Sequence, residues 1–215
     1  MIVGVVPAAG RAARLQPLRC SKEVLPVRGR PVMEHLLERL RAAPCDEIRV
    51  VTRPEKRDVA ALAERHGATV VLGEPPTVPA SLALGLADLE ADDVLLFGFP
   101  DTLWEPRDGF ARLASELDGW DAAVGVFRSA EPGRGDVVEL GPDGAVERIH
   151  VKSADPPGEL VWGCLAARVS ALARVERCAE VSHHLRTLRV RGVVFASDFV
   201  DVGTPAALAA LRTTA

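Results

Sequence analysis

Short apolar segments alternate with helix-length segments through the first half of the chain, and this alternation constrains the fold more than any other feature. The run from Ile2 to Val6 carries no charged side chain, which is typical of a strand buried on both faces. We expect strands at 2–6, 47–52, 69–72 and 94–98, and helices at 31–40, 57–66, 80–89 and 107–117. This order predicts an α/β fold with a Rossmann-like, mostly parallel central sheet covered by helices. Ligands of such sheets bind beyond the carboxyl ends of the strands.

The second half of the chain is richer in predicted strands. We expect strands at 122–127, 137–140, 145–152 and 160–167, the middle two joined as a hairpin, and then helices at 182–188 and 205–212. The turn sequence Gly-Pro-Asp-Gly at 141–144 favours that hairpin. We therefore expect one α/β domain over residues 1–215 with a small β-rich insertion, its halves meeting near residue 120.

Charge and hydropathy restrict the classes of partner. The chain has 26 Lys and Arg against 30 Asp and Glu, a net charge of −4, so no surface for nucleic acid is expected. No apolar stretch approaches the roughly 20 residues of a membrane helix, and no basic segment precedes the first apolar run. The four cysteines form no C-x-x-C pair, which is typical of free thiols in a reducing compartment. We expect a cytoplasmic protein, monomeric or homodimeric.

Lysine is scarce in this chain, since nearly all the basic residues are arginine. The lysines are Lys22, Lys56 and Lys152. A compact ammonium group at Lys22 indicates a place where a point charge suits better than a planar guanidinium. Lys56 lies in no motif, and we expect it to be an ordinary surface residue.

The loop after the first strand is a candidate phosphate site. It contains mainly small residues around Gly10, so that backbone N–H groups can approach an anion closely, and Arg14 adds a forked donor. The segment is neither a G-x-G-x-x-G fingerprint nor a Walker A loop.

Three consecutive motifs resemble the sugar-phosphate nucleotidyltransferases, with glucose-1-phosphate thymidylyltransferase as the nearest kind. They are Ala-Ala-Gly-x-x-x-Arg-Leu-x-Pro-Leu at 8–18, Ser-Lys-x-x-Leu-Pro-Val at 21–27, and Arg-Pro-Val-Met-Glu-His at 30–35. The resemblance implies a fold of the nucleotide-diphospho-sugar transferase type, whose first half binds an NTP. It further implies that Arg14 and Lys22 neutralise the phosphates during the reaction. The loop residues that would bind the nucleotide are Ala8, Ala9, Gly10 and Arg11.

The resemblance extends to the rest of the chain. Asp101 follows a buried strand and Asp201 lies in Phe-Val-Asp-Val-Gly-Thr, at the positions of two Mg²⁺-binding aspartates of the family. Lys152 stands where the family has a lysine that contacts the sugar phosphate. Trp162 and Gly163 stand where the family often has a glycine of the acceptor pocket, so we expect Trp162 either to line that pocket or to pack in the core. The segment that contacts the base in the family corresponds here to Thr77 and Pro79.

Several positions depart from the family pattern. Ala12 and Ala13 stand where a glycine and a threonine are usual, and Ala80 replaces a glutamine that reads the base. Val151 replaces a glutamate that binds a sugar hydroxyl, so the acceptor is not fixed by the resemblance.

Three functions follow in order of support. The first is an Mg²⁺-dependent transferase that joins a nucleoside monophosphate from an NTP to a sugar 1-phosphate and releases pyrophosphate. The second is a cytidylyltransferase-like enzyme that acts on an alcohol phosphate or a phosphonate. The third is a nucleotide-binding regulatory domain without catalysis.

Overall fold

The computed structural model describes residues 1–203, and within that range it leaves out the side chains of Arg14 and Asp198. The helix expected at 205–212 lies outside the described residues.

Four parallel strands form the first half of the central sheet. They lie side by side in the order β6 (Val94–Gly98), β1 (Ile2–Pro7), β4 (Glu47–Thr52) and β5 (Thr69–Leu72). Five of the six residues of β1 are buried, because helices cover both faces of the sheet. The prediction of a buried parallel strand at the start of the chain is confirmed.

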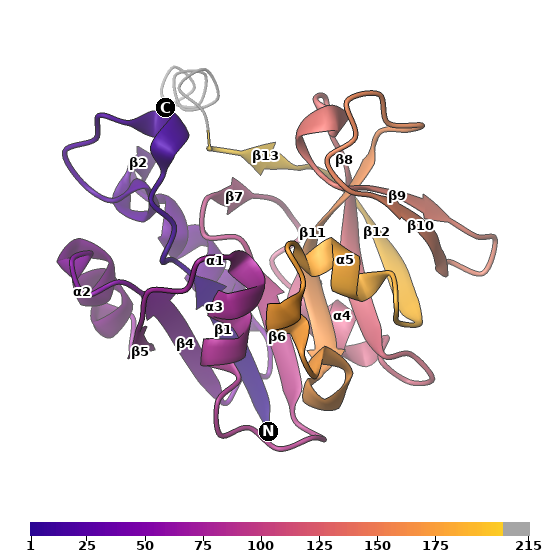
Figure 1. Ribbon diagram of the computed structural model, residues 1–215, viewed down its shortest axis with the longest axis horizontal. Coiled ribbons are helices and arrows are strands. Elements are labelled where there is room, and N and C mark those ends of the chain that lie inside the picture. Colours follow the sequence, from indigo (N-terminus) through magenta and orange to yellow (C-terminus); the bar gives the residue numbers. More distant parts are fainter. Residues whose placement is uncertain (204–215) are drawn as a thin grey trace.

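The helices divide between the two faces. α1 (Val32–Ala42), α2 (Arg57–Arg65) and α4 (Gly109–Ser115) contribute to one core cluster, through side chains such as Leu36 and Phe110. α3 (Val78–Gly85) and α5 (Val181–Leu185) contribute Leu82 and Leu185 to the other cluster. In Figure 1, α3 and α5 lie in front of the sheet. The expected fold class is confirmed.

The second half adds strands of both directions to the same sheet. β11 (Leu160–Arg168) runs antiparallel between β6 and β8 (Ala122–Arg128), and so joins the two halves. β9 (Val137–Leu140) and β10 (Val146–His150) form the expected hairpin.

A further strand, β12 (Val190–Asp198), was not expected from the sequence. It pairs in parallel with β8, with Gly192 opposite Val124. Arg191 and Gly192 interrupt its apolar pattern, and the pairing with a buried neighbour compensates for the weak local signal.

Several predicted helices differ in their bounds. α3 begins at Val78 because Thr77 caps it, its Oγ1 accepting a hydrogen bond of 3.2 Å from the N–H of Ala80. Helix α4 spans Gly109–Ser115, which is shorter than expected.

Two pairs of very short strands lie outside the main sheet. β2 (Pro26–Val27) pairs with β3 (Arg30–Pro31), and β7 (Thr102–Leu103) pairs with β13 (Val200–Asp201). Short 3₁₀ helices complete the description: η1 (Ala13–Leu15), η2 (Lys22–Val24), η3 (Pro132–Arg134), η4 (Val169–Leu172) and η5 (Val175–Arg177). Among residues 1–203, no helix has the length and apolar content needed to cross a bilayer.

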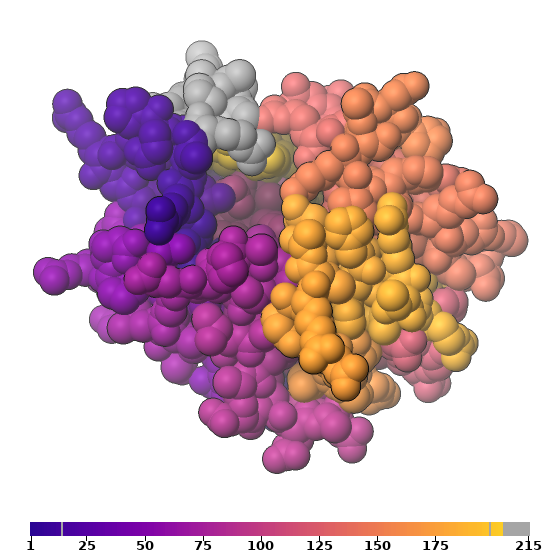
Figure 2. Space-filling model, viewed as in Figure 1, coloured from indigo at the N-terminus to yellow at the C-terminus, as the bar shows by residue number. Residues whose placement is uncertain are grey.

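β7 and β13 lie at the carboxyl end of the parallel strands, between the two halves of the chain (Figure 1). The space-filling view in Figure 2 shows the molecule hollowed at this place, between the indigo-to-magenta first half and the orange second half. Ligand sites of open α/β sheets are found at such an edge.

Candidate active site

The loop that follows β1, residues 8–15, is called here the β1 loop. Ala8 and Ala9 are buried, and the N–H of Ala8 still donates to the carbonyl of Val51 at 2.8 Å. Gly10 is exposed, and a Cβ built on it would meet nothing within 4 Å. The backbone at Gly10 is therefore open to a ligand.

Ala12 has a left-handed backbone, with φ of 51° and ψ of 40°, immediately before η1. Glycine adopts this conformation at little cost, whereas an L-residue is strained by it. The β1 loop thus keeps at Ala12 the conformation that the usual glycine would favour. The side chain of Arg14 lies outside the description, so its role stays a prediction.

A cavity of about 650 Å³ lies against the β1 loop. It is lined by Gly10, Arg11 and Ala12, by Lys22, and by the segment between β4 and α2. Its cationic side chains are Arg11, Arg19, Lys22, Arg53, Lys56 and Arg57, and its carboxylates are Glu55 and Asp58. Lys22, Arg53 and Lys56 are also paired with Asp101, Glu74 and Glu23, carboxylates that lie outside this lining. The smaller surplus of positive charge that remains, to which Arg11, Arg19 and Arg57 contribute, favours an anionic ligand.

Lys22 lies between this cavity and a second one. Its Nζ donates to Oδ2 of Asp101 at 2.6 Å, and both side chains are largely buried. Burial disfavours the charge of Lys22, but the ion pair with Asp101 outweighs it and raises the pKa of Lys22 above its ordinary value. The ammonium group therefore stays charged at neutral pH.

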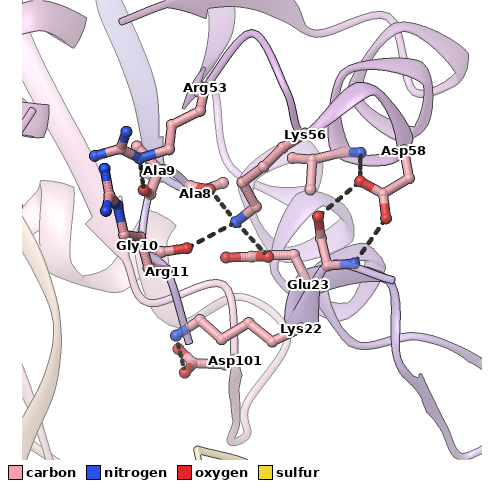
Figure 3. Close-up of polar contacts among 12 residues, drawn as sticks. Ala8, Ala9, Gly10, Arg11, Lys22, Glu23, Arg53, Lys56, Asp58 and Asp101 are labelled. Atoms are coloured by element: carbon pink, nitrogen blue, oxygen red, sulfur yellow. Dashed lines mark hydrogen bonds and ion pairs between the residues drawn. The ribbon is translucent and has the colours of Figure 1, made fainter. Parts of the chain in front are cut away.

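Lys56 is not the surface residue that the sequence suggested. It is 9% exposed, and its Nζ donates to the carbonyl of Ala8 at 2.6 Å and to Oε2 of Glu23 at 2.7 Å. Figure 3 shows its ammonium group between the β1 loop and Glu23. The expectation was wrong because these partners lie far away in the sequence, and the polar neighbours of Lys56 resemble those of an ordinary surface loop.

Asp101 and Asp201 come together through the pairing of β7 with β13. Asp201 is opposite Thr102, and the N–H of Val202 donates to the carbonyl of Asp101 at 2.8 Å. Both aspartates line the second cavity, of about 260 Å³. Over the described part of the chain, no group of three or more His, Cys, Asp or Glu side chains could hold a metal by itself.

The opposite wall of the second cavity comes from the later half of the chain. Lys152, in a left-handed conformation after β10, pairs with Glu180, and both line the cavity with Trp162. Trp162 is buried, and its Nε1–H donates to Oγ of Ser182 at 2.7 Å. Gly163 lies under Phe199, since a Cβ there would come within 2.1 Å of that ring.

The remaining candidates lie at the start of α3. Thr77 is partly exposed, whereas Pro79 is buried in the first turn of the helix. Their neighbour Val78 reaches the second cavity.

Residues 4–194 match the family described as the MobA-like NTP transferase domain. The match covers most of the chain. The chain belongs to this family. The expected recognition of a nucleotidyltransferase is thereby confirmed.

Curated relatives of this MobA-like NTP transferase domain include bifunctional GlmU proteins. The protein of Azorhizobium caulinodans is 30% identical over 217 residues, covering 98% of this chain and 48% of the relative. That of Rhodopseudomonas palustris strain TIE-1 is 30% identical over 207 residues, covering 92% of this chain and 44% of the relative. The chain therefore spans about half the length of the curated relatives it matches.

Solved structures share the fold. A protein described as a glucose-1-phosphate thymidylyltransferase from Bacillus anthracis, in complex with sucrose, aligns with a TM-score of 0.85 at 17% identity, covering 100% of this chain and 95% of that one. UDP-glucose pyrophosphorylase complexed with UDP-glucose aligns with a TM-score of 0.83 at 17% identity, covering 100% of this chain and 98% of that one.

The structure thus brings Lys22, Asp101, Asp201, Lys152 and Trp162 of this NTP transferase domain to one cavity. Gly10 and Arg11 lie at the neighbouring one, which Lys22 also lines. Sequence reasoning missed Glu180, for which no motif gave a signal. It also missed Lys56, although the scarcity of lysine was a usable signal.

Proposed function

We propose that the chain transfers a nucleoside monophosphate from an NTP to a sugar 1-phosphate, giving an NDP-sugar and pyrophosphate, with Mg²⁺ as the metal. The observation that carries the proposal is the position of Lys22. It lies between a cavity with surplus positive charge and a cavity lined by Asp101, Asp201 and Lys152. This arrangement supports two phosphorylated ligands that meet at Lys22.

In the proposed reaction, an oxygen of the acceptor phosphate attacks the α-phosphorus of the NTP. A new P–O bond forms, the bond to the β-phosphate oxygen breaks, and pyrophosphate leaves with the bonding electrons. Because the acceptor phosphate is already ionised, the reaction needs no general base, and positioning and charge neutralisation supply most of the catalysis. Lys22, whose charge is retained, would neutralise the phosphates where the two ligands meet.

The donor set at this edge fits Mg²⁺. Mg²⁺ prefers carboxylate oxygens and binds through one or two of them together with substrate phosphates and water. Asp101 and Asp201 supply two carboxylates on adjacent short strands in one cavity. The bound ion would add charge stabilisation at the phosphate oxygens.

The acceptor side offers groups for both a phosphate and hydroxyls. Lys152 can meet a phosphate, and Glu180 beside it supplies a carboxylate that Val151 lacks. A carboxylate at this wall favours a polyhydroxylated acceptor such as a sugar phosphate, since it can accept hydrogen bonds from hydroxyls. UDP-glucose in a structure of the same fold supports this class of product.

The test is a pyrophosphate-release assay over ATP, CTP, GTP, UTP and dTTP, each combined with sugar 1-phosphates, alcohol phosphates and phosphonates. The variants are Lys22→Met and Asp101→Asn, with Asp92→Asn as the control because Asp92 is exposed. We expect turnover with at least one pair that contains a sugar 1-phosphate. Each site variant should lower it about 100-fold or more, and the control should leave it unchanged.

Two results would overturn the proposal. Nucleotide binding without turnover of any pair would favour the regulatory domain instead. Turnover of alcohol phosphates or phosphonates alone would favour the cytidylyltransferase-like alternative.

A further inference from the structure

The segment between β4 and α2, residues 53–58, holds three consecutive carbonyls of the β1 loop. Lys56 Nζ donates to the carbonyls of Ala8 at 2.6 Å and Gly10 at 3.1 Å. Arg53 Nε donates to the carbonyl of Ala9, between them, at 2.8 Å. The path of the β1 loop is therefore set by two cations from another segment (Figure 3).

The same segment also holds both neighbours of Lys22. Asp58 accepts hydrogen bonds from the N–H and from the Oγ–H of Ser21, each at 2.7 Å. Lys56 pairs with Glu23 at 2.7 Å. Residues 53–58 thus connect the β1 loop with the turn of η2 that carries Lys22.

The contacts of Lys56 use its whole hydrogen-bonding capacity. An ammonium group has three N–H donors, and Lys56 has three acceptors in the carbonyls of Ala8 and Gly10 and the carboxylate of Glu23. A planar guanidinium cannot direct its donors to three such converging oxygens, which gives a reason for lysine here in an arginine-rich chain. With all three donors engaged, Lys56 has no N–H left for a ligand, so an effect of Lys56 on ligand binding would pass through the β1 loop that it holds.

The pair is also costly to break from one side. Glu23 is 0% exposed and its Oε1 has no hydrogen-bond partner. Burial raises the pKa of Glu23 and lowers that of Lys56, so each depends on the other to stay charged.

We propose that Lys56 is a positioning residue, which fixes the β1 loop relative to Lys22 and thereby sets the affinity for the phosphates of the NTP. The inference rests on the proposed function only in taking the β1 loop as the phosphate site.

The test measures phosphate affinity separately from turnover. Binding of inorganic pyrophosphate and of the preferred NTP is followed by calorimetry in the full chain, alongside KM for each substrate and the midpoint of thermal unfolding. The variants are Lys56→Met, Lys56→Arg, and the double variant Lys56→Met with Glu23→Gln. Arg65→Met, at the end of the helix α2 that follows Lys56, is the control, because Arg65 is exposed and its Nη1 donates to the carbonyl of Ala61 within that helix.

We expect Lys56→Met to weaken pyrophosphate binding and to raise KM for the NTP by about tenfold or more, with KM for the acceptor changed less than about twofold. Lys56→Arg should recover only part of this loss. The single variant leaves Glu23 buried without a partner and could unfold, and the double variant removes both charges to restore stability. Even with its stability restored, the double variant should bind pyrophosphate more weakly than the wild type does.

The two proposals fail in different ways. A folded double variant with the pyrophosphate affinity of the wild type would show that Lys56 serves stability alone, and would overturn the positioning role. The opposite outcome is also possible: the double variant binds pyrophosphate more weakly than the wild type, but the wild type turns over no substrate pair. That result would support the positioning role and overturn only the transferase reaction.

Discussion

Ala12 shows how a single residue can be strained inside a binding loop. Its φ of 51° lies in the left-handed region, which costs an L-residue roughly 1–2 kcal/mol. Replacing it by glycine removes that strain, although glycine loses more conformational entropy on folding. We expect Ala12→Gly to raise the free energy of unfolding by up to about 1 kcal/mol in urea denaturation.

Ala13→Gly is the matched control, because Ala13 follows in η1 and is exposed. We expect Ala13→Gly to lower the free energy of unfolding by about 0.5–1 kcal/mol, since glycine is unfavourable where the backbone is helical. Equal losses in both variants would contradict the strain at Ala12.

His35 gives the protein a pH-dependent component of stability. It is buried in α1, its Nε2–H donates to the carbonyl of Val27, and its Nδ1 accepts from Arg30. Burial lowers its pKa below the ordinary value of 6.5, and the charges of Arg30, Arg39 and Arg28 act in the same direction.

The sign follows from proton binding in the two states. Above pH 6.5 both states hold His35 neutral, and its contribution to stability is fully present. As pH falls below 6.5, the unfolded state binds the proton first, so stability is lost down to the folded pKa. We expect the wild type to lose more unfolding free energy than His35→Gln between about pH 7 and pH 5. His183→Gln, at an exposed histidine, should keep the wild-type dependence.

The lysines illustrate what residue type alone can predict. The motif around Lys22 marked this lysine as a candidate, because the order of residues within a motif is a local signal, but it could not predict the contact with Asp101, which comes from another element. Lys56 and Glu180 belong to no such motif. Their partners come from other elements, and only packing brings them together.

At the scale of elements, one hydroxyl connects α5 to the sheet. Ser182 of α5 is fully buried, accepts from Trp162 Nε1 of β11 at 2.7 Å, and donates to Asp136 ahead of β9. Removing it leaves a buried indole N–H without its acceptor. We expect Ser182→Ala to lower the unfolding free energy by about 1–3 kcal/mol in chemical denaturation.

Ser115→Ala, at an exposed serine of α4, is the control and should change stability by less than about 0.5 kcal/mol. An effect of Ser182→Ala no larger than this would show that water replaces the lost contact.

The predictability of the elements follows their local patterns. β1 and β6 were predicted because unbroken apolar runs mark strands buried on both faces. β12 was not, because Arg191 and Gly192 break its pattern and its strand state depends on pairing with β8. The short strands β7 and β13 carry no local signal at two residues each.

At the scale of the whole molecule, a small third core cluster joins the end of the described chain to its beginning. Val202 is buried there against residues that include Leu15, Leu25, Val32 and Leu103. The cluster stabilises the antiparallel pair that carries Asp201 beside Asp101.

We expect Val202→Ala to lower the unfolding free energy by about 1–2 kcal/mol, since it removes buried methyl groups and leaves a cavity. The measurement is urea denaturation, with Val194→Ala on the exposed face of β12 as the control. A loss as small as that of the control would mean that this cluster does not stabilise the fold.

The sequence by itself predicted the parallel sheet, and its motifs supplied the candidate residues. Apolar runs predict buried strands, a motif is a short run of residues, and both signals are local. Only the tertiary structure decided which of these residues meet. Three sets of contacts join segments that are far apart in the chain: the approach of Asp201 to Asp101, the pairing of Lys152 with Glu180, and the three contacts of Lys56. Such contacts depend on how strands pair and helices pack, which no local pattern records.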